Sequence, residues 1–163
     1  MTRSFFRCVA CASLFLPIVS ACHHPFAAER YSQSSESAEM INPVLHFEIP
    51  VTDMERAVSF YQSVFGIKLR RDEVDGYEMA FFPRDDRAPG ASGALAKGDV
   101  YKPSLEGTII YFDVNSIDTV LERASASGSR VLYEKTDLGA AGYVAEFEDS
   151  EGNRIALTQS PDE

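Results

Sequence analysis

The sequence is short of positive charge. It carries 15 Lys and Arg residues against 25 Asp and Glu residues, so its formal net charge at pH 7 is −10. A surface with this excess of negative charge repels phosphate backbones and anionic lipid headgroups. We therefore exclude nucleic acid as a partner, and we expect no electrostatic attachment of the folded part to a membrane.

Histidine is scarce as well, with three in 163 residues. His23 and His24 are adjacent and are interpreted as part of a solvated linker, and no histidine follows His46. A Ser-His-Asp hydrolase would have to use His46 as its base, and no nucleophile-elbow motif accompanies it. We therefore predict no hydrolytic triad.

The chain also lacks an apolar run of the roughly 20 residues that a membrane-spanning helix needs. Residues 8–19 follow a basic start and have the length of the apolar part of a signal peptide. The next residues, VSAC at 19–22, resemble the lipobox of bacterial lipoproteins, in which small residues precede a cysteine that receives lipid. This resemblance predicts a lipoprotein signal peptide over residues 1–21 and lipidation of Cys22. An ordinary secretory signal cut nearby is the alternative.

Cysteine becomes rarer still if the chain is cut before Cys22. Cleavage removes Cys8 and Cys11 together with two arginines, which leaves one cysteine and moves the net charge from −10 to −12. No disulfide can then form within the chain, although the periplasm permits disulfides. His23, the next residue, is not the aspartate that retains lipoproteins at the inner membrane. The resemblance therefore favours the cell envelope and, within it, the outer membrane facing the periplasm.

A tether and one domain make up the remainder. Residues 22–41 are rich in Ser, Ala and Glu and show no sustained apolar periodicity, which is typical of a solvated linker. Residues 42–160 are enough for one modest domain.

The predicted domain is organised around residues 44–66, VLHFEIPVTDMERAVSFYQSVFG. The first eight residues alternate between two faces, as in a strand with a core on one side and a cleft or solvent on the other. His46 and Glu48 share the second face. Asp53 supplies a helix-capping oxygen, apolar residues then recur at three- and four-residue spacing, and Gly66 is placed to end the helix.

The same unit recurs 63 residues later. Residues 51–55 align by residue class with residues 114–118, and both helical patterns end at a glycine, Gly66 and Gly128. A repeated strand, cap, helix and terminal glycine indicate an internal duplication. We predict two strand–helix–three-strand (βαβββ) modules.

The other elements follow from alternation and turn residues. In the first module we expect strands at 67–70, 77–82 and 93–97, with a turn at 75–76. The aromatic residues of 77–82 are predicted to pack in the core rather than to form the wall of a ligand site. In the second module we expect a strand at 108–114, a helix at 116–127, and strands at 130–134, 143–148 and 154–158.

This plan resembles the vicinal oxygen chelate (VOC) superfamily, which includes glyoxalase I, extradiol dioxygenases, fosfomycin-resistance enzymes and bleomycin-resistance proteins. The residues that carry the resemblance are 46–53, SFYQSVFG at 59–66 and DSEGNRI at 149–155. It implies an α+β fold in which tandem modules, about 42–97 and 108–160, form a cupped mixed sheet around a cleft. It also implies a homodimer, because a second chain often completes the cleft in this family.

The enzymes of this family hold a divalent metal (Zn, Ni, Fe or Mn) through ligands from both modules. His46, seven residues before Asp53, matches the first ligand. Ile109 (Thr108 if the register slips by one) stands at the equivalent strand position of the second module, Ala156 replaces the glutamate of the closing strand, and residues 93–96 hold no carboxylate. We expect no cofactor, because a catalytic metal normally has about three protein ligands.

Four side chains are predicted to contact a ligand in the cleft: His46, Glu48, Tyr111 and Glu146. Tyr111 holds the place in the second module that Glu48 holds in the first, and Glu146 lies on a strand close enough to reach the cleft. A rebuilt metal site that uses His46 and Glu48, completed by Tyr111 or Glu146, is the alternative.

Three functions stay open at this point. The favoured one is a membrane-anchored module that binds a small molecule in a metal-free cleft, like the metal-free resistance proteins of the family. The second is a metal-dependent lyase or isomerase of glyoxalase I type, or a relative of the family's dioxygenases, with a rebuilt metal site. The third is a scaffold that dimerises and binds other proteins. Whether the chain is an enzyme is left open.

Overall fold

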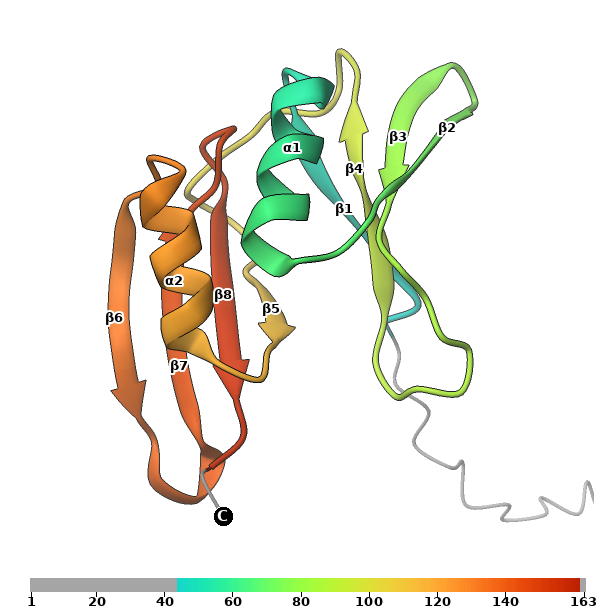
Figure 1. Ribbon diagram of the computed structural model, residues 1–163. Coiled ribbons are helices and arrows are strands. Elements are labelled where there is room, and N and C mark those ends of the chain that lie inside the picture. Colours follow the sequence, from blue (N-terminus) through green and yellow to red (C-terminus); the bar gives the residue numbers. More distant parts are fainter. Residues whose placement is uncertain (1–43, 162–163) are drawn as a thin grey trace, which may run out of the picture. The chain divides into compact units, whose positions relative to one another are not determined.

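One unit of secondary structure occurs twice in the computed structural model, which describes residues 44–161 (Figure 1). The first module contains β1 (His46–Val51), α1 (Met54–Phe65), β2 (Arg70–Val74), β3 (Tyr77–Phe81) and β4 (Ser92–Lys97). The second contains β5 (Ile110–Asp113), α2 (Ile117–Ala126), β6 (Val131–Asp137), the short 3-10 turn η1 (Gly139–Ala141), β7 (Tyr143–Glu148) and β8 (Arg154–Gln159). The predicted signal peptide, Cys22 and the whole tether lie outside the described residues.

Each module forms its own four-stranded mixed sheet. The strand orders are β1-β4-β3-β2 and β5-β8-β7-β6. The first strand of each module pairs in parallel with the last, and the other pairs are antiparallel. The predicted α+β fold of two βαβββ modules is therefore confirmed, and the two sheets have the same topology, as a duplication requires.

The two helices begin in the same way. The Asp53 side chain accepts a hydrogen bond from the Arg56 backbone nitrogen at 3.0 Å, and the Ser116 side chain accepts one from the Thr119 nitrogen at 3.2 Å. These bonds satisfy helix donors that have no partner within the helix. Gly66 follows α1 with φ of 67°, the left-handed conformation predicted for that position.

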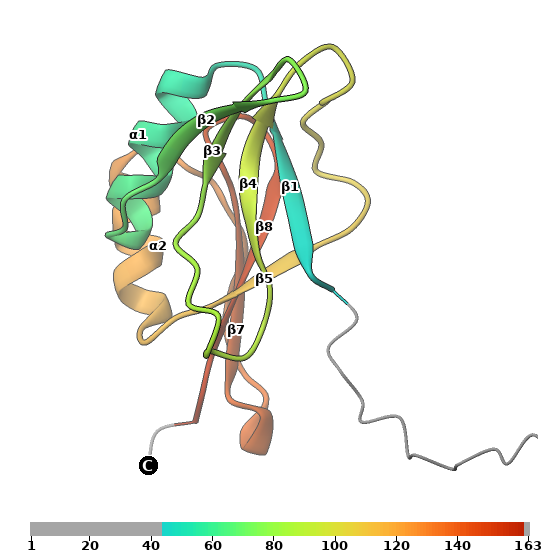
Figure 2. The same cartoon turned by 90° about the vertical axis from the view of Figure 1, so that its right-hand side faces the viewer.

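Both helices lie on the same side of the strands (Figure 2). They contact each other and the sheet of their own module, and α1 covers β3 and β4. The apolar stripe of α1 supplies Met54, Ala57, Phe60, Tyr61 and Val64 to the core, all of which are buried. No helix of the described residues lies on the other sheet faces, and His46 and Glu48 lie on that face of the first sheet. No helix in residues 44–161 has the length and hydropathy to cross a membrane.

One predicted strand is displaced. Residues 67–70 were expected to form a strand, but β2 starts at Arg70 and runs to Val74, and all five of its residues are exposed. A strand with no buried face carries no apolar alternation that would reveal it. Pairing with β3 through the predicted turn at 75–76 fixes its position, with Val74 opposite Tyr77.

A polar joint formed by the turn after β7 holds the two modules together. Glu151 in this turn accepts hydrogen bonds from the Thr52 and Asp53 backbone nitrogens at 3.0 Å each, and from Arg56 Nε at 2.8 Å. Asn153 donates to the Pro50 carbonyl oxygen at 2.8 Å. The N-terminus of α1 is thereby closed by a carboxylate from the other module.

Asp149 extends this joint into the core. It accepts a hydrogen bond from the hydroxyl of the fully buried Tyr61 at 2.7 Å, and two more from the Glu151 and Asn153 backbone nitrogens. Burial raises the pKa of Tyr61 well above its ordinary value of 10.0, and the charge of Asp149 adds to the shift. Tyr61 therefore acts as a neutral donor at physiological pH.

Candidate ligand-binding cleft

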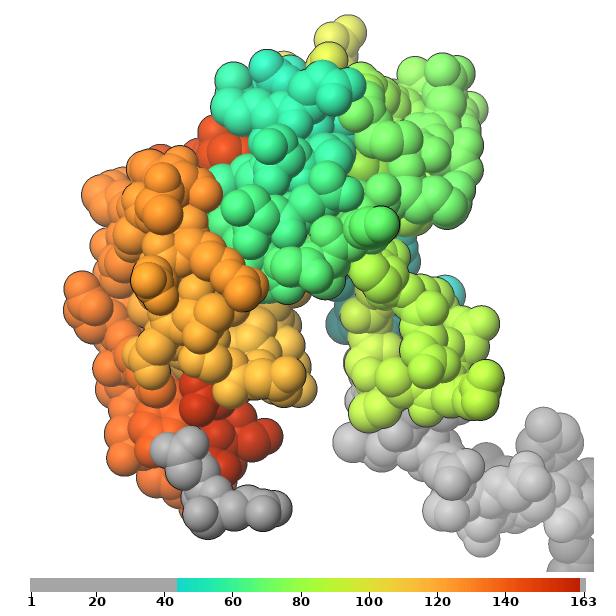
Figure 3. Space-filling model, in the orientation of Figure 1, coloured from blue at the N-terminus to red at the C-terminus, as the bar shows by residue number. Residues whose placement is uncertain are grey.

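A cleft of about 730 Å³ opens between the two modules. Figure 3 shows it as a hollow below α1, between the loop that joins β3 to β4 on one side and β5 with α2 on the other. The first module supplies residues from β1, the end of α1 and the β3–β4 loop, and the second supplies β5 and the first turns of α2. Its volume lies in the range of small-molecule sites in proteins.

Four phenylalanines form the floor of the cleft. Phe65 and Phe112 have ring centroids 4.8 Å apart, and Phe82 and Phe112 are separated by 5.5 Å. Phe47 lies 5.8 Å from both Phe82 and Phe112. These rings come from four different elements, so the aromatic floor exists only when the two modules are together. Such a surface suits a flat apolar ligand.

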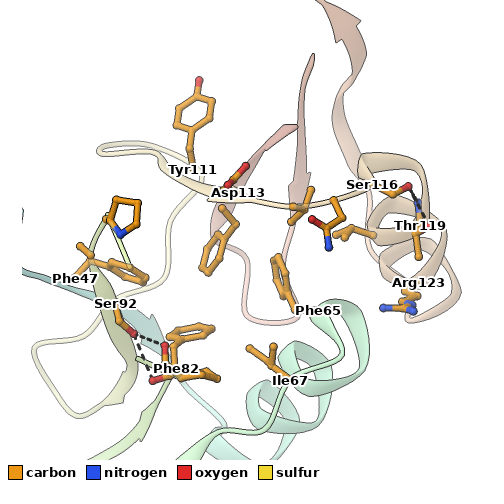
Figure 4. A pocket seen from close by; sticks show the side chains of 18 residues that line it. Phe47, Phe65, Ile67, Phe82, Ser92, Tyr111, Asp113, Ser116, Thr119 and Arg123 are labelled. Carbon is orange, nitrogen blue, oxygen red and sulfur yellow. Dashed lines mark hydrogen bonds between the residues drawn. The ribbon is translucent and has the colours of Figure 1, made fainter. Parts of the chain in front are cut away.

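Polar side chains line the rim (Figure 4). Ser92 donates its hydroxyl hydrogen to the Pro83 carbonyl oxygen at 3.0 Å. On the α2 side, Ser116 accepts from the Thr119 hydroxyl at 3.1 Å, and Arg123 reaches the end of α1, where Nη1 lies 3.5 Å from the Val64 carbonyl oxygen. A floor of rings with a few polar groups at the rim is the usual composition of a ligand site.

Two other depressions are less suitable. One, of about 580 Å³, has serines and two arginines along its wall, but Arg56 is paired with Glu151 and Arg130 with Glu148. The other, of about 220 Å³, lies along β1 and the connector between the modules and includes Glu48. We therefore take the cleft between the modules as the candidate site.

The structure brings together two of the four predicted contacts. His46 Nε2 lies 3.7 Å from Glu48 Oε1, on the helix-free face of the first sheet, with both side chains more than a third exposed. Tyr101 of the connector donates its hydroxyl to Glu48 at 2.7 Å. This hydrogen bond raises the pKa of Tyr101 to about 12. Neither His46 nor Glu48 lines the cleft with the phenylalanine floor.

Tyr111 and Glu146 lie on the helix-free face of the second sheet. Strand register places them in one row, since each is paired with Ala156 of β8. Tyr111 also borders the cleft, and its ring points away from the phenylalanines (Figure 4). Glu146 is 7% exposed and bonded to Arg154, with Nε at 2.8 Å. Tyr111 and Glu146 therefore lie in one row of side chains across the second sheet. On the first sheet, the side chains of His46 and Glu48 lie directly beside each other.

Sequence reasoning did not identify the residues that line the cleft on its helix side. The phenylalanines follow the apolar alternation of their strands, which predicted a core position for Phe82, and Phe82 is indeed 8% exposed. The same ring faces the cleft because the β3–β4 loop and α2 stand apart at this point. The sequence held one weak indication of this part of the cleft. Arg123 is a charged residue next to Val120 and Ala124, which belong to the buried stripe of α2.

The side chains at the family's metal positions do not suit a metal ion. Ile109, Ala156 and residues 93–96 supply no ligand atom. Glu48, the nearest carboxylate to His46, already accepts a hydrogen bond from Tyr101. Within residues 44–161 no three His, Cys, Asp or Glu side chains lie together as a metal site would need. A metal held by His46 alone would have too few ligands, so no reaction step is assigned to one.

Comparison with known proteins agrees with this architecture. Residues 44–157 match the family model for the Glyoxalase/Bleomycin resistance protein/Dioxygenase superfamily. A glyoxylase-like domain-containing protein of Didymella fabae is 31% identical over 121 residues, which cover 70% of this chain and 91% of that protein. A lactoylglutathione lyase of Haemophilus influenzae is 28% identical over 124 residues, covering 72% and 92%. Among solved structures, TnmS3, an antibiotic binding protein of Streptomyces, is 23% identical, with a TM-score of 0.54, and the match covers 74% of this chain and 98% of that one.

Proposed function

The chain belongs to the glyoxalase/bleomycin resistance protein/dioxygenase superfamily, and on this premise we propose that it binds an apolar small molecule in the cleft between its modules, without a metal ion. The observation that carries this proposal is the cleft of about 730 Å³ with its floor of four phenylalanine rings. A scaffold that only bound other proteins would have no use for such a cleft.

The donor set supports binding without a metal. Of the positions where the family's enzymes carry ligands, His46 alone has a suitable side chain, and it is more than a third exposed. Affinity for a divalent ion depends on the number and geometry of ligands, so a single imidazole with a partly engaged Glu48 would release the ion on dialysis. The likeness to an antibiotic binding protein is consistent with a binding role.

A metal analysis paired with a ligand screen tests the proposal. The soluble chain (residues 22–163 with Cys22→Ser) is purified, dialysed, analysed for transition metals and screened for ligands that raise its melting temperature. We expect less than stoichiometric metal, ligands that stabilise the chelator-treated protein, and no turnover of the methylglyoxal–glutathione adduct above background. Ligands that stabilise the protein only after metal is restored would contradict it.

A lyase of glyoxalase I type is the second candidate. The likeness to the Haemophilus lactoylglutathione lyase favours it. It requires a metal site rebuilt around His46 and Glu48, whose side chains are 3.7 Å apart. One stoichiometric metal that His46→Ala and Glu48→Ala each release would make this the better account. If neither variant changes the metal content, the lyase candidate fails.

We also propose that lipid on Cys22 holds the domain at the cell envelope, on the outer membrane facing the periplasm. The support is the run VSAC at 19–22 after an apolar segment of signal-peptide length. Cys22→Ser is expected to abolish labelling by a fatty-acid precursor and to release the protein from the membrane fraction. A Cys22→Ser protein that still fractionates with membranes until detergent is added would contradict the lipid anchor.

A further inference from the structure

The two modules differ in what lies in front of their helices. In front of α1, the Glu151 carboxylate accepts hydrogen bonds from the backbone nitrogens of Thr52 and Asp53, both at 3.0 Å. That carboxylate comes from the turn between the third and fourth strands of the opposite module. The duplication places Asn115 and Ser116 in front of α2 where Thr52 and Asp53 stand in front of α1.

In front of α2 the Gln159 side-chain oxygen accepts a hydrogen bond from the Ile117 backbone nitrogen at 2.9 Å, and no carboxylate of residues 44–161 arrives there. The β3–β4 loop of the first module is the counterpart of the turn that carries Glu151, but it stands on the far side of the cleft from Asn115 and Ser116. Among the described residues, 44–161, no acceptor bonds to the backbone nitrogens of Asn115 and Ser116. The cleft therefore occupies the place where the other half of the molecule has a carboxylate and its supporting loop.

Arg123 adds a positive charge to the same cleft. Its side chain lines the wall beside Thr119, one helical turn further along α2 (Figure 4). Its hydrogen bond is to the Val64 carbonyl oxygen at a long 3.5 Å, and no carboxylate of residues 44–161 pairs with it. Arg56, by contrast, gives two nitrogens to Glu151 at 2.8 and 2.9 Å. A guanidinium beside an aromatic floor, in a chain with a net charge of −10, is suited to an anion.

We propose that the ligand of the cleft is an aromatic carboxylate, with its ring system on the phenylalanine floor and its carboxylate facing Arg123 and the backbone nitrogens of Asn115 and Ser116. The ligand's carboxylate would hold at α2 the place that Glu151 holds at α1. This inference rests on the proposed binding function and narrows its ligand class. Asp113 is the acidic group of the cleft wall, and it lies on β5 beside Tyr111, across from Arg123 (Figure 4).

Three probes of one shape separate charge from apolar contact: 2-naphthoate, the neutral 2-naphthamide and the cationic 2-naphthylmethylammonium. Each is titrated into the soluble chain, with the dissociation constant measured by calorimetry and the backbone amide signals followed by NMR. The carboxylate should bind at least about tenfold more tightly than the amide, because charge-assisted hydrogen bonds are the stronger ones. The Asn115 and Ser116 amide protons should move downfield with 2-naphthoate alone.

Two variants and their controls locate the charge. Arg123→Gln should bring the affinity for 2-naphthoate down to that for 2-naphthamide, and Arg123→Lys should keep most of the preference. Lys68→Gln removes an exposed positive charge outside the cleft and should change neither affinity, while Asp113→Asn should not weaken carboxylate binding. Circular dichroism melting confirms that each variant is folded.

The outcomes distinguish this inference from the proposed function. Equal affinity for the three probes, or a carboxylate preference that survives Arg123→Gln, overturns the inference while leaving a cleft that binds apolar molecules. Failure of 2-naphthoate to bind the parent chain also overturns it. If no compound of the screen binds in the cleft, the proposed function fails as well.

Discussion

At the scale of single residues, the side-chain carboxylate of Glu151 links the two modules through several hydrogen bonds. Its side chain is fully buried and accepts from both backbone and side chain of Thr52, from the Asp53 nitrogen and from Arg56. Although burial opposes ionisation, these donors lower the pKa of Glu151 from its ordinary 4.5 to about 2. The carboxylate is therefore charged throughout the physiological range.

Glu151→Gln is expected to lower the free energy of unfolding by about 1–3 kcal/mol at pH 7, because Arg56 loses its charged partner and one amide hydrogen faces backbone donors. The folded-state pKa lies below the unfolded one, so the carboxylate stabilises the fold above about pH 4.5, and this contribution is lost as the pH falls toward about 2. Chemical denaturation of both proteins from pH 7 to pH 3 measures the difference.

The same series with Glu134→Gln, an exposed carboxylate on β6, is the control and should change stability little. A Glu151→Gln effect that stayed constant down to pH 3 would show that shape rather than charge matters at this position.

Individual side chains were predictable from sequence where a strand fixed their direction. Alternation placed His46 and Glu48 on one face, and the structure confirms this, with 3.7 Å between them. Tyr101 escaped prediction because it lies in an irregular connector, where no periodicity indicates which way a side chain points. Arg123 escaped because an exposed arginine on a helix is ordinarily solvated, and its surroundings in the cleft depend on the first module, where it reaches the Val64 carbonyl oxygen.

At the scale of elements, the close pairing of β1 with β4 depends on Gly93. Gly93 is the register partner of Phe47, whose ring forms part of the cleft floor. A Cβ atom at Gly93 would lie 2.2 Å from the Phe47 carbonyl oxygen and 2.5 Å from its ring. Backbone cannot yield as a flexible side chain can, so the strand pair and the floor both rely on this glycine.

Gly93→Ala is therefore expected to destabilise the protein by about 2–4 kcal/mol through strain and displaced packing. Lys97→Ala, an exposed change at the far end of the same strand, should cost under about 1 kcal/mol. Urea denaturation of the two variants checks the contrast. Equal stabilities would show that β1 and β4 are not packed closely at Gly93 and Phe47.

Prediction of elements succeeded where burial shaped the sequence. The helix caps at Asp53 and Ser116 and the strand at Tyr143–Glu148 follow from residue pattern, and the structure has them. The exposed β2 was displaced because its five residues, RRDEV, have no buried face and are positioned by their partner strand. No residue pattern in the β3–β4 loop predicts the distance between this loop and α2.

At the scale of the whole molecule, we propose a homodimer, as the family resemblance implies. The helix-free face of the second sheet exposes two large rings, Tyr111 at 52% and Tyr133 at 46%. Strand register places both in the row that includes Glu146 and Ala156. Aromatic rings on an exposed sheet face are a surface that a second chain would cover.

Sedimentation equilibrium of the soluble chain at micromolar concentration should give the mass of two chains, and Tyr133→Glu should shift the equilibrium toward one. Glu134→Gln, at the next position along β6, is the matched surface change and should leave the mass unchanged. A parent chain with the mass of a single copy at all concentrations would rule the dimer out.

The arrangement of the modules was the part of the fold that sequence could not supply. Duplication predicted two similar halves, and they are present. The contact between the halves depends on groups more than 90 residues apart, such as Asn153 and the Pro50 carbonyl oxygen. The cleft is present because the β3–β4 loop stands apart from α2. The candidate site arises from that difference between the halves, so no repeat comparison alone could locate it.

The central claim, that the cleft between the modules binds a ligand without metal, is tested most directly by filling it. Ala91 lies in the β3–β4 loop and lines the cleft, whereas Ala88 is exposed in the same loop and does not line it. The affinity of 2-naphthoate, or of the best ligand from the screen, is measured by calorimetry on chelator-treated Ala91→Trp, Ala88→Trp and parent protein. The account predicts binding in the parent and in Ala88→Trp and a loss of at least about tenfold in Ala91→Trp, since a bulky ring would occupy the ligand's volume. Equal affinity in all three proteins, or binding that appears only when a divalent metal is added back, would contradict it.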